Sequence, residues 1–206
     1  MSDRGNSLVS EDEVDNERRR FLIATTAGVG AVGAVGAALP FVLSFQPSER
    51  AKAIGAPVEV DISKLEPGQR MIATWRGQPV WVMRRTEKAL KDLETMSAFL
   101  RDPESKVVSQ QPAYAQNVAR ATKAEYLVVI GYCTHLGCSP TYLPEGTPHN
   151  LGDEWKGGFF CPCHGSKFDL AGRVFKGVPA PTNLVVPPYH YLNDTLILVG
   201  EDGGAA

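Results

Sequence analysis

The sequence predicts a mainly β protein: an antiparallel β-sheet domain with one inserted helix, preceded by a single N-terminal transmembrane helix. Three observations support this fold class. A long apolar run lies near the N-terminus, short apolar runs recur through the rest of the chain, and 20 glycines and 15 prolines are spread over 206 residues. That composition is typical of loop-rich β domains rather than of helical bundles. The charges nearly balance, and no basic patch with interleaved aromatic residues indicates nucleic acid as a partner.

The N-terminal region predicts an export signal followed by a transmembrane helix. Residues 1–17 are polar and acidic, and we interpret them as a disordered cytoplasmic tail. Residues 18–45 begin with Arg18-Arg19-Arg20-Phe21-Leu22 and continue for about 25 uncharged residues, enough to cross a hydrocarbon core of about 30 Å. The arginines resemble a twin-arginine export signal, although they could be only the flanking charges of a membrane helix. In both cases the N-terminus stays cytoplasmic and the rest is exported.

The anchor and the segment after it suggest contact with a partner and a tether. Four glycines allow close helix approach in lipid, which favours packing against another membrane protein over a lone helix in lipid; they are Gly28, Gly30, Gly33 and Gly36. Residues 46–57 are polar, small and bracketed by prolines, so we interpret them as a linker. Composition does not distinguish a fixed tether from a mobile hinge.

Residues 58–206 contain the predicted β domain. Alternating or continuous apolar residues predict strands at 58–62, 71–75, 80–83, 126–130, 184–186 and 196–199. The segment 76–79 predicts a hairpin connection, and Asn193-Asp194 predicts a turn. Thr86 is expected to cap a helix that runs from Glu87 to about Leu100 and ends before Pro103.

All four cysteines and two of the four histidines lie in two short boxes. The first is Cys133-Thr134-His135-Leu136-Gly137-Cys138 and the second is Cys161-Pro162-Cys163-His164-Gly165-Ser166. Each box offers a thiolate and an imidazole, spaced C-x-H and C-x-x-H, together with one further cysteine. Apolar segments precede both boxes and would present them as two facing loops. The sequence therefore predicts a site with two sulfur and two nitrogen ligands.

Such a site could bind zinc, or a [2Fe–2S] cluster in which two histidines replace two cysteines on one iron. Structural zinc sites usually pair cysteines as C-x2–4-C and histidines as H-x3–5-H, and neither box has these pairs. The second box is one residue short of the C-x-x-C-H haem attachment site. A framework of disulfides alone would give the two histidines no role. We therefore favour the cluster over zinc.

The boxes resemble those of the Rieske proteins of quinol–cytochrome c oxidoreductases, and the likeness covers nearly the whole chain. It implies a Rieske-type antiparallel β-sheet domain with a small cluster-binding subdomain at about residues 131–182. By this resemblance Cys133 and Cys161 bind one iron, and His135 and His164 bind the other. It also implies that Cys138 and Cys163 form a disulfide between the two loops, which suits an oxidising compartment.

The resemblance assigns roles to several further residues. Ser166 stands where the family's serine donates a hydrogen bond to a bridging sulfide. Phe168 stands where high-potential members have a tyrosine bonded to a cysteine sulfur, which implies a lower potential here. Gly177, Pro179, Ala180 and Pro181 resemble the family's proline loop beside the cluster, although Val178 interrupts the familiar order. His149 and His190 lie outside the boxes, and we interpret them as surface or structural residues.

The resemblance also implies a function. The chain is expected to be the [2Fe–2S] subunit of a respiratory quinol–cytochrome c oxidoreductase, a translocase in the bacterial inner membrane. It would take one electron from quinol, give the proton to a histidine ligand, and pass the electron to a c-type cytochrome. His164 is the expected quinol contact and His135 the second exposed imidazole. Expected partners are cytochrome b, the c-type cytochrome subunit and membrane lipid, in a dimeric complex.

Two other functions remain open at this point. The domain could be the Rieske subunit of another periplasmic oxidoreductase, such as arsenite oxidase. Alternatively, it could be a zinc-stabilised, membrane-anchored binding module without a redox role. The electron-transfer interpretation predicts that the reduction potential falls at alkaline pH, because an added electron favours protonated imidazole.

Overall fold

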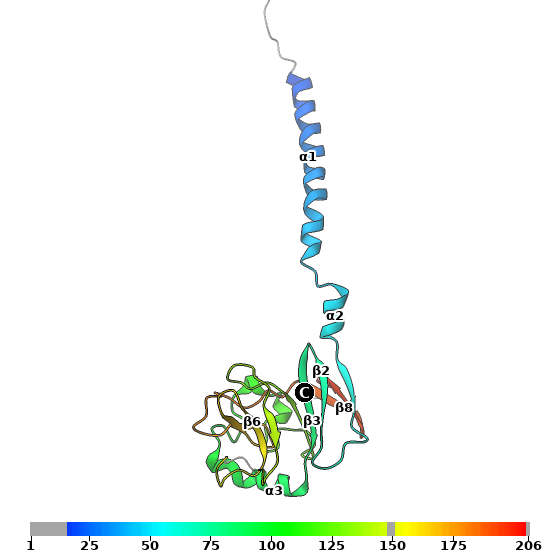
Figure 1. Ribbon diagram of the computed structural model, residues 1–206. Coiled ribbons are helices and arrows are strands. Elements are labelled where there is room, and N and C mark those ends of the chain that lie inside the picture. The colour runs from blue at the N-terminus through cyan, green and yellow to red at the C-terminus, as the bar shows by residue number, and fades with distance from the viewer. Residues whose placement is uncertain (1–15, 148–150, 205–206) are drawn as a thin grey trace, which may run out of the picture. The chain divides into compact units, whose positions relative to one another are not determined.

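The computed structural model describes residues 16–147 and 151–204 (Figure 1). They belong to two compact units, one that ends at Arg50 and one that begins at Ala51. Most of the predicted N-terminal tail, together with His149, lies outside the described residues.

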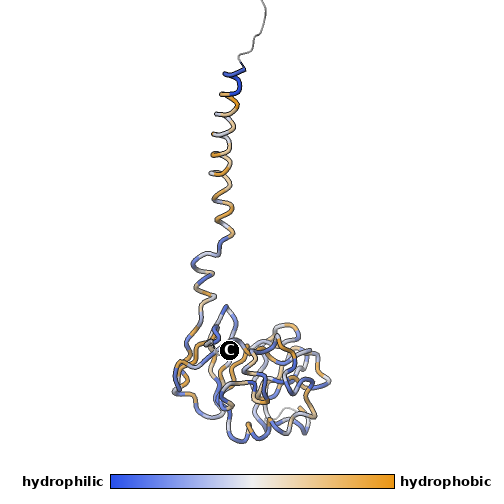
Figure 2. The backbone as a smooth tube through the Cα atoms, turned by 180° about the vertical axis from the view of Figure 1, so that it is seen from behind, coloured by the Kyte–Doolittle hydropathy of each residue, from blue (hydrophilic) through white to orange (hydrophobic). Residues whose placement is uncertain are grey.

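The first unit is built on helix α1, Asn16–Ser44. Its 29 residues span about 44 Å at about 1.5 Å per residue, and an 18-residue window has a mean hydropathy of 1.8. None of its residues is buried, and Figure 2 shows a hydrophilic start followed by a largely hydrophobic helix. Thr25 donates its hydroxyl to the Phe21 carbonyl at 2.7 Å, so this polar group is satisfied within the helix. The length and composition confirm a helix that could span a membrane.

A second helix occupies most of the predicted linker. Helix α2 runs from Glu49 to Gly55. Composition did not predict it, because isolated helices this short are marginal in water and no periodic apolar pattern marks it. The linker thus contains a short helix with a few irregular residues on either side.

The strands of the second unit form three antiparallel sheets of three strands each within the described residues. Their orders are β1-β9-β8, β2-β3-β4 and β5-β6-β7. The strand bounds are β1 Val58–Asp61, β2 Arg70–Trp75, β3 Gln78–Arg84, β4 Tyr126–Ile130, β5 Thr141–Leu143, β6 Gly158–Cys161, β7 Ser166–Phe168, β8 Tyr189–Asn193 and β9 Leu196–Val199. The first sheet brings the two ends of this unit together, since Val60 pairs with Ile197.

The predicted strand at 184–186 is wrong. Leu184 donates its N–H to Gly172, the Val185 carbonyl accepts from Ile130, and Val186 donates to Gln110, each at 2.8 Å. These bonds go to three different segments rather than to one neighbouring strand, so an apolar run was misread as a ladder strand. The short strands β5, β7 and β8 were not predicted.

Helix α3, Glu87–Thr95, is the inserted helix. The Thr86 hydroxyl accepts a hydrogen bond from the Ala89 N–H at 3.2 Å, which confirms the predicted cap. The end of the predicted helix tightens into the 3-10 helix η1, Met96–Phe99. Two more 3-10 turns follow in the long connection to β4: η2, Val108–Gln110, and η3, Ala113–Ala115.

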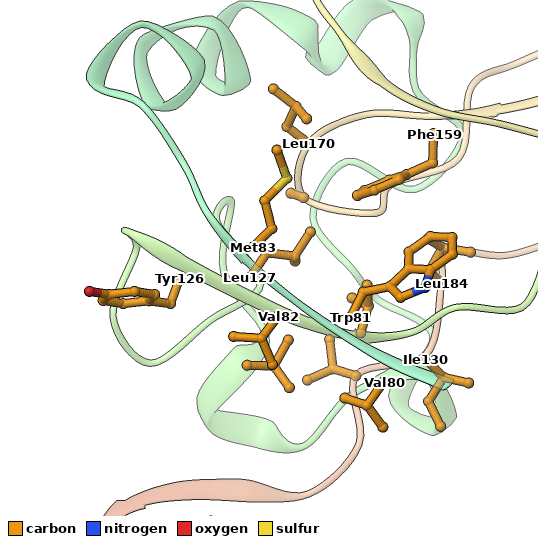
Figure 3. Close-up of a cluster of buried hydrophobic side chains, with 14 of the residues drawn as sticks. Val80, Trp81, Val82, Met83, Tyr126, Leu127, Ile130, Phe159, Leu170 and Leu184 are labelled. Carbon is orange, nitrogen blue, oxygen red and sulfur yellow. The ribbon is translucent and has the colours of Figure 1, made fainter. Parts of the chain in front are cut away.

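The hydrophobic core is continuous with the cysteine boxes. Successive residues of β3 and β4 are buried, which explains why both read as unbroken apolar runs rather than alternating ones. Trp81 and Phe159 pack with ring centroids 5.0 Å apart, and Figure 3 shows them beside Leu184. The same cluster includes Cys133 and Cys161. The two box loops are therefore rooted in the core.

Candidate metal centre

The two boxes fold as matching loops. The first follows β4 through Gly131, where a Cβ would lie 2.3 Å from the Trp81 ring, so the chain passes tightly over the core. Gly137 donates its N–H to the Cys133 carbonyl, and Gly165 donates to the Cys161 carbonyl, both at 2.9 Å. These glycines have φ of 81° and 77°, and both lie beside open space. The backbone conformation, rather than crowding, is what requires glycine here.

A disulfide joins the two loops, as the resemblance implied. Cys138 and Cys163 are bonded with their Cα atoms 6.7 Å apart, across a sequence separation of 25. Cys133 and Cys161 remain as free thiols, and both are buried. The sulfurs of Cys138, Cys161 and Cys163 lie within 4.8 Å of one another. Since Cys138 and Cys163 are joined in the disulfide, the thiol of Cys161 is the available ligand of this group.

The two box histidines lie against each other. The rings of His135 and His164 have centroids 4.8 Å apart and are inclined at 88°. His164 is exposed and His135 is half-buried. The structure thus brings together the two imidazoles as one pair, and the Cys133 and Cys161 thiols as another, with one member of each pair from each loop.

The surroundings of Cys133 suit a thiolate bound to metal. Burial raises the pKa of this thiol, and the neighbouring Cys161 thiol raises it further, whereas hydrogen bonds from the His135 backbone N–H and the Ser166 hydroxyl lower it. Two buried cysteines this close would be costly as bare thiolates, and a metal centre offsets that cost. Donors aimed at a cysteine sulfur are the outer contacts that tune iron–sulfur sites. The donor set thus fits a [2Fe–2S] cluster with mixed ligands.

The proline loop is fastened to both boxes. Ala180 is fully buried, and its N–H donates to the Ser166 hydroxyl oxygen at 3.0 Å. Thr134 donates its hydroxyl to the Thr182 carbonyl at 2.7 Å. One side of the loop is therefore held by the second box and the other by the first.

The interrupted order of this loop has a local explanation. Gly177 adopts a φ of 71°, and the following Val178 packs against the core as a half-buried side chain. The Val178 carbonyl accepts a hydrogen bond from the Arg101 guanidinium at 3.1 Å. The extra valine thus contributes an apolar contact and a backbone tie while the loop stays in place.

Two groups near the site were missed from sequence. Thr134 is one of these, because a single hydroxyl in the sequence gives no signal of a hydrogen-bond partner 48 residues away. Three buried arginines, Arg85, Arg120 and Arg173, were also missed, because arginine is almost always exposed. The remaining described histidine, His190, lies in β8 with Nδ1 3.1 Å from the Glu201 carbonyl oxygen, away from the boxes.

The fold and the donor set define an iron–sulfur protein of the Rieske class. The protein-family model described as the Rieske [2Fe-2S] domain matches residues 58–190. A second model, described as the "Ubiquitinol-cytochrome C reductase Fe-S subunit TAT signal", matches residues 9–48. The chain is 61% identical to the ubiquinol-cytochrome c reductase iron-sulfur subunit of Allochromatium vinosum, covering 96% of this chain and 95% of that protein.

A relative of the same description from Blastochloris viridis is 42% identical over 94% of this chain and 98% of its own length. Among solved structures, a chain of a hyperthermophilic respiratory Complex III is 27% identical with a TM-score of 0.48, covering 84% of this chain and 97% of its own. The chain belongs to the family of ubiquinol-cytochrome c reductase iron-sulfur subunits.

Family membership settles several expectations. The Rieske-type [2Fe–2S] cofactor and an electron-transfer role are confirmed, and the zinc-stabilised module and the other periplasmic oxidoreductases are set aside. The arginine-led start is confirmed as a twin-arginine signal rather than mere flanking charge. The signal and the apolar helix α1 fit a membrane-anchored subunit with an exported Rieske domain.

Proposed function

We propose that Cys133 and Cys161 ligate one iron of the cluster and that His135 and His164 ligate the other. The observation that carries this proposal is that the same two loops bring together two imidazoles, with ring centroids 4.8 Å apart, and supply two buried free thiols. The disulfide between Cys138 and Cys163 removes the other two cysteines from competition. When bound, such a cluster supplies one-electron transfer at a higher potential than a cluster with four thiolates, because neutral imidazoles leave it less negative.

The proposed reaction is oxidation of a quinol with transfer of one electron onward to a c-type cytochrome. The exposed imidazole of His164 contacts the quinol hydroxyl and, in its deprotonated form, accepts the hydroxyl proton at the ring nitrogen that is not an iron ligand. His135, which is half-buried, presents the second imidazole toward the electron acceptor's path. Burial of Cys133, Cys161, Ser166 and Ala180 keeps water from the side of the site that faces the core. The quinol thus loses its proton and its electron at the exposed edge formed by His164, and the released proton contributes to proton translocation.

The proposed setting is the bacterial inner membrane. The N-terminus lies in the cytoplasm, α1 crosses the bilayer once, and the Rieske domain is periplasmic. The proposed partners are cytochrome b and the c-type cytochrome subunit of a dimeric complex, together with membrane lipid around α1. The small residues of α1 support packing against another membrane helix, since none of them is buried within the described residues.

The ligand assignment is tested by metal analysis and electron paramagnetic resonance of native protein. We expect iron and acid-labile sulfide in equal amounts, and a low-average-g signal after reduction. Replacing His164 with Gln should abolish this signal, whereas the matched change His190→Gln should preserve it, since His190 bonds to the C-terminal segment instead. Zinc, or a signal that survives His164→Gln, would overturn the assignment.

A second assay tests the substrate. Isolated intact membrane complex should oxidise quinol and reduce cytochrome c, and haem of both b and c types should copurify with the chain. Copurification with a soluble molybdenum protein and no haem would contradict the proposal.

A further inference from the structure

A cluster of buried arginines surrounds the turn that follows β7. Within the described residues, the buried basic side chains are Arg85, Arg120 and Arg173, which are 2%, 0% and 0% exposed. Cations are almost never fully buried unless they are paired. All three guanidinium groups bind the same turn, residues 169–173.

The acceptors of these hydrogen bonds differ in charge. Arg173 donates its Nε to the Asp169 carboxylate at 2.7 Å. Arg85 donates instead to the Leu170 carbonyl at 3.1 Å, and Arg120 donates to the Ala171 carbonyl at 3.2 Å. Carbonyl oxygens satisfy donors but do not neutralise a cation. Two of the three guanidinium groups are therefore solvated by neutral acceptors.

The buried charges do not cancel. Asp169 is the buried acidic residue of the described chain, against three buried arginines. Asp102, which lies within electrostatic reach of Arg120, is only half-buried and accepts two backbone N–H groups. Burial lowers the pKa of Arg85 and of Arg120 to about 10, so both are still cationic at neutral pH. The interior behind the second box carries a net positive charge.

Neutral side chains perform the same bonding task nearby, so positive charge is not needed to satisfy backbone carbonyls. Asn183, which is fully buried, donates to the Asp102 carbonyl at 3.0 Å. Gln111 donates to the Ser105 carbonyl at 2.8 Å. Amide groups can therefore close loops in this part of the core, and the arginines add charge as well as hydrogen bonds.

The charged turn lies close to the metal centre. It follows directly after β7, whose first residue is Ser166, and Ser166 contacts the Cys133 thiol. Asp169 lies three residues beyond Ser166, so it is about 10 Å away along the strand at about 3.3 Å per residue. A unit charge about 12 Å from the centre would, at an effective dielectric constant of about 20, change a one-electron equilibrium about tenfold.

We infer that Arg85 and Arg120, which remain after Arg173 is paired with Asp169, raise the reduction potential of the centre by holding uncompensated positive charge in the core. This inference rests on the proposed function. The added electron is stabilised by the field of buried cations, which salt screens much less than it screens surface charges. The arginines act through this field and touch neither ligands nor substrate.

Opposite charge changes test the inference. Arg120→Gln removes a buried positive charge and should lower the midpoint potential by up to about 59 mV. This shift corresponds to an about tenfold change in the one-electron equilibrium constant. Asp169→Asn removes the buried negative charge and should raise the potential by a comparable factor. Arg120→Lys retains the charge and should stay close to the parent protein. The measurement is a redox titration of the resonance signal of the complete membrane complex.

A surface change and a salt series complete the design. Lys106→Gln removes an exposed positive charge on the neighbouring segment and should leave the potential unchanged at moderate salt. Shifts of the same sign for Arg120→Gln and Asp169→Asn, or equal shifts for Arg120→Gln and Arg120→Lys, would overturn the inference in favour of a packing role. If Arg120→Gln does not fold, Arg85→Gln and Asp169→Asn make the same opposite-sign comparison. If the parent protein shows no low-average-g signal, the proposed function is overturned. If the signal is present but the variants have unchanged potentials, only this inference is overturned.

Discussion

At the residue scale, Phe168 contributes packing near the centre but has no hydroxyl that could tune the reduction potential. Phe168 is fully buried in β7 and pairs with Phe159 across the sheet. A tyrosine there would bring a hydroxyl into the same apolar setting, where a buried donor needs a partner. By the family resemblance that partner is a cysteine sulfur of the cluster. The phenylalanine keeps the packing and omits the hydrogen bond.

Phe168→Tyr is therefore expected to raise the reduction potential by tens of millivolts, where about 59 mV corresponds to a factor of ten. Hydrogen bonds to cluster sulfurs favour the more negative, reduced form. Redox titration of the purified complex measures the shift, and Phe159→Tyr is a control on the paired strand. An unchanged potential in Phe168→Tyr would show that the new hydroxyl bonds elsewhere.

At the scale of elements, the disulfide connects loops that come from two different sheets. The first box follows β4 and the second joins β6 to β7, and within the described residues these strands belong to separate sheets. Replacing both Cys138 and Cys163 with Ser should lower the free energy of unfolding by about 3–4 kcal/mol, from the closure entropy of a loop of this length. Thermal loss of the visible cluster spectrum measures the effect. A spectrum equally resistant to heat would mean that the proline loop alone holds the boxes together.

Helix α2 gives the tether a defined conformation that a substitution can disturb. Ala51→Pro together with Ala53→Pro removes backbone donors and adds rigid rings. If catalysis requires the head to move, turnover of quinol should slow while the resonance spectrum stays unchanged. The matched pair Ala51→Gly and Ala53→Gly loosens the same positions and should preserve more turnover than the prolines do. Equal turnover in the parent, proline and glycine proteins would indicate a static head.

At the scale of the whole molecule, the proposed imidazole ligands are expected to couple electron transfer to proton binding. A reduced centre favours protonated imidazole, so the reduced state binds more protons than the oxidised state. Raising the pH therefore disfavours reduction, and the potential should fall by up to about 59 mV per pH unit at alkaline pH. Voltammetry of the complete protein across neutral and alkaline pH measures this slope. A potential independent of pH would contradict proton transfer to a histidine ligand.

Much of the element content followed from local patterns. The continuous apolar runs of β3 and β4, the Thr86 cap and the uncharged α1 segment each depend on neighbouring residues, so the chain itself displays them. The wrong strand prediction at residues 184–186 also came from a local apolar pattern. Its residues are apolar because they are buried, yet their hydrogen bonds go to Ile130, Gly172 and Gln110. Burial is visible in a sequence, but the identity of a distant partner is not.

The chemistry of this protein could be inferred from its residues alone. Two thiolates and two imidazoles at unusual spacing, with two further cysteines, restricted the metal centre, and an arginine-led apolar run indicated export and anchoring. The supports of the site became visible only in the folded chain. They are the Thr134–Thr182 and Ser166–Ala180 hydrogen bonds and the buried arginines around residues 169–173. The physical reason is that ligand identity is a property of single side chains. Support and electric field depend instead on residues far apart in the chain, which only folding brings together.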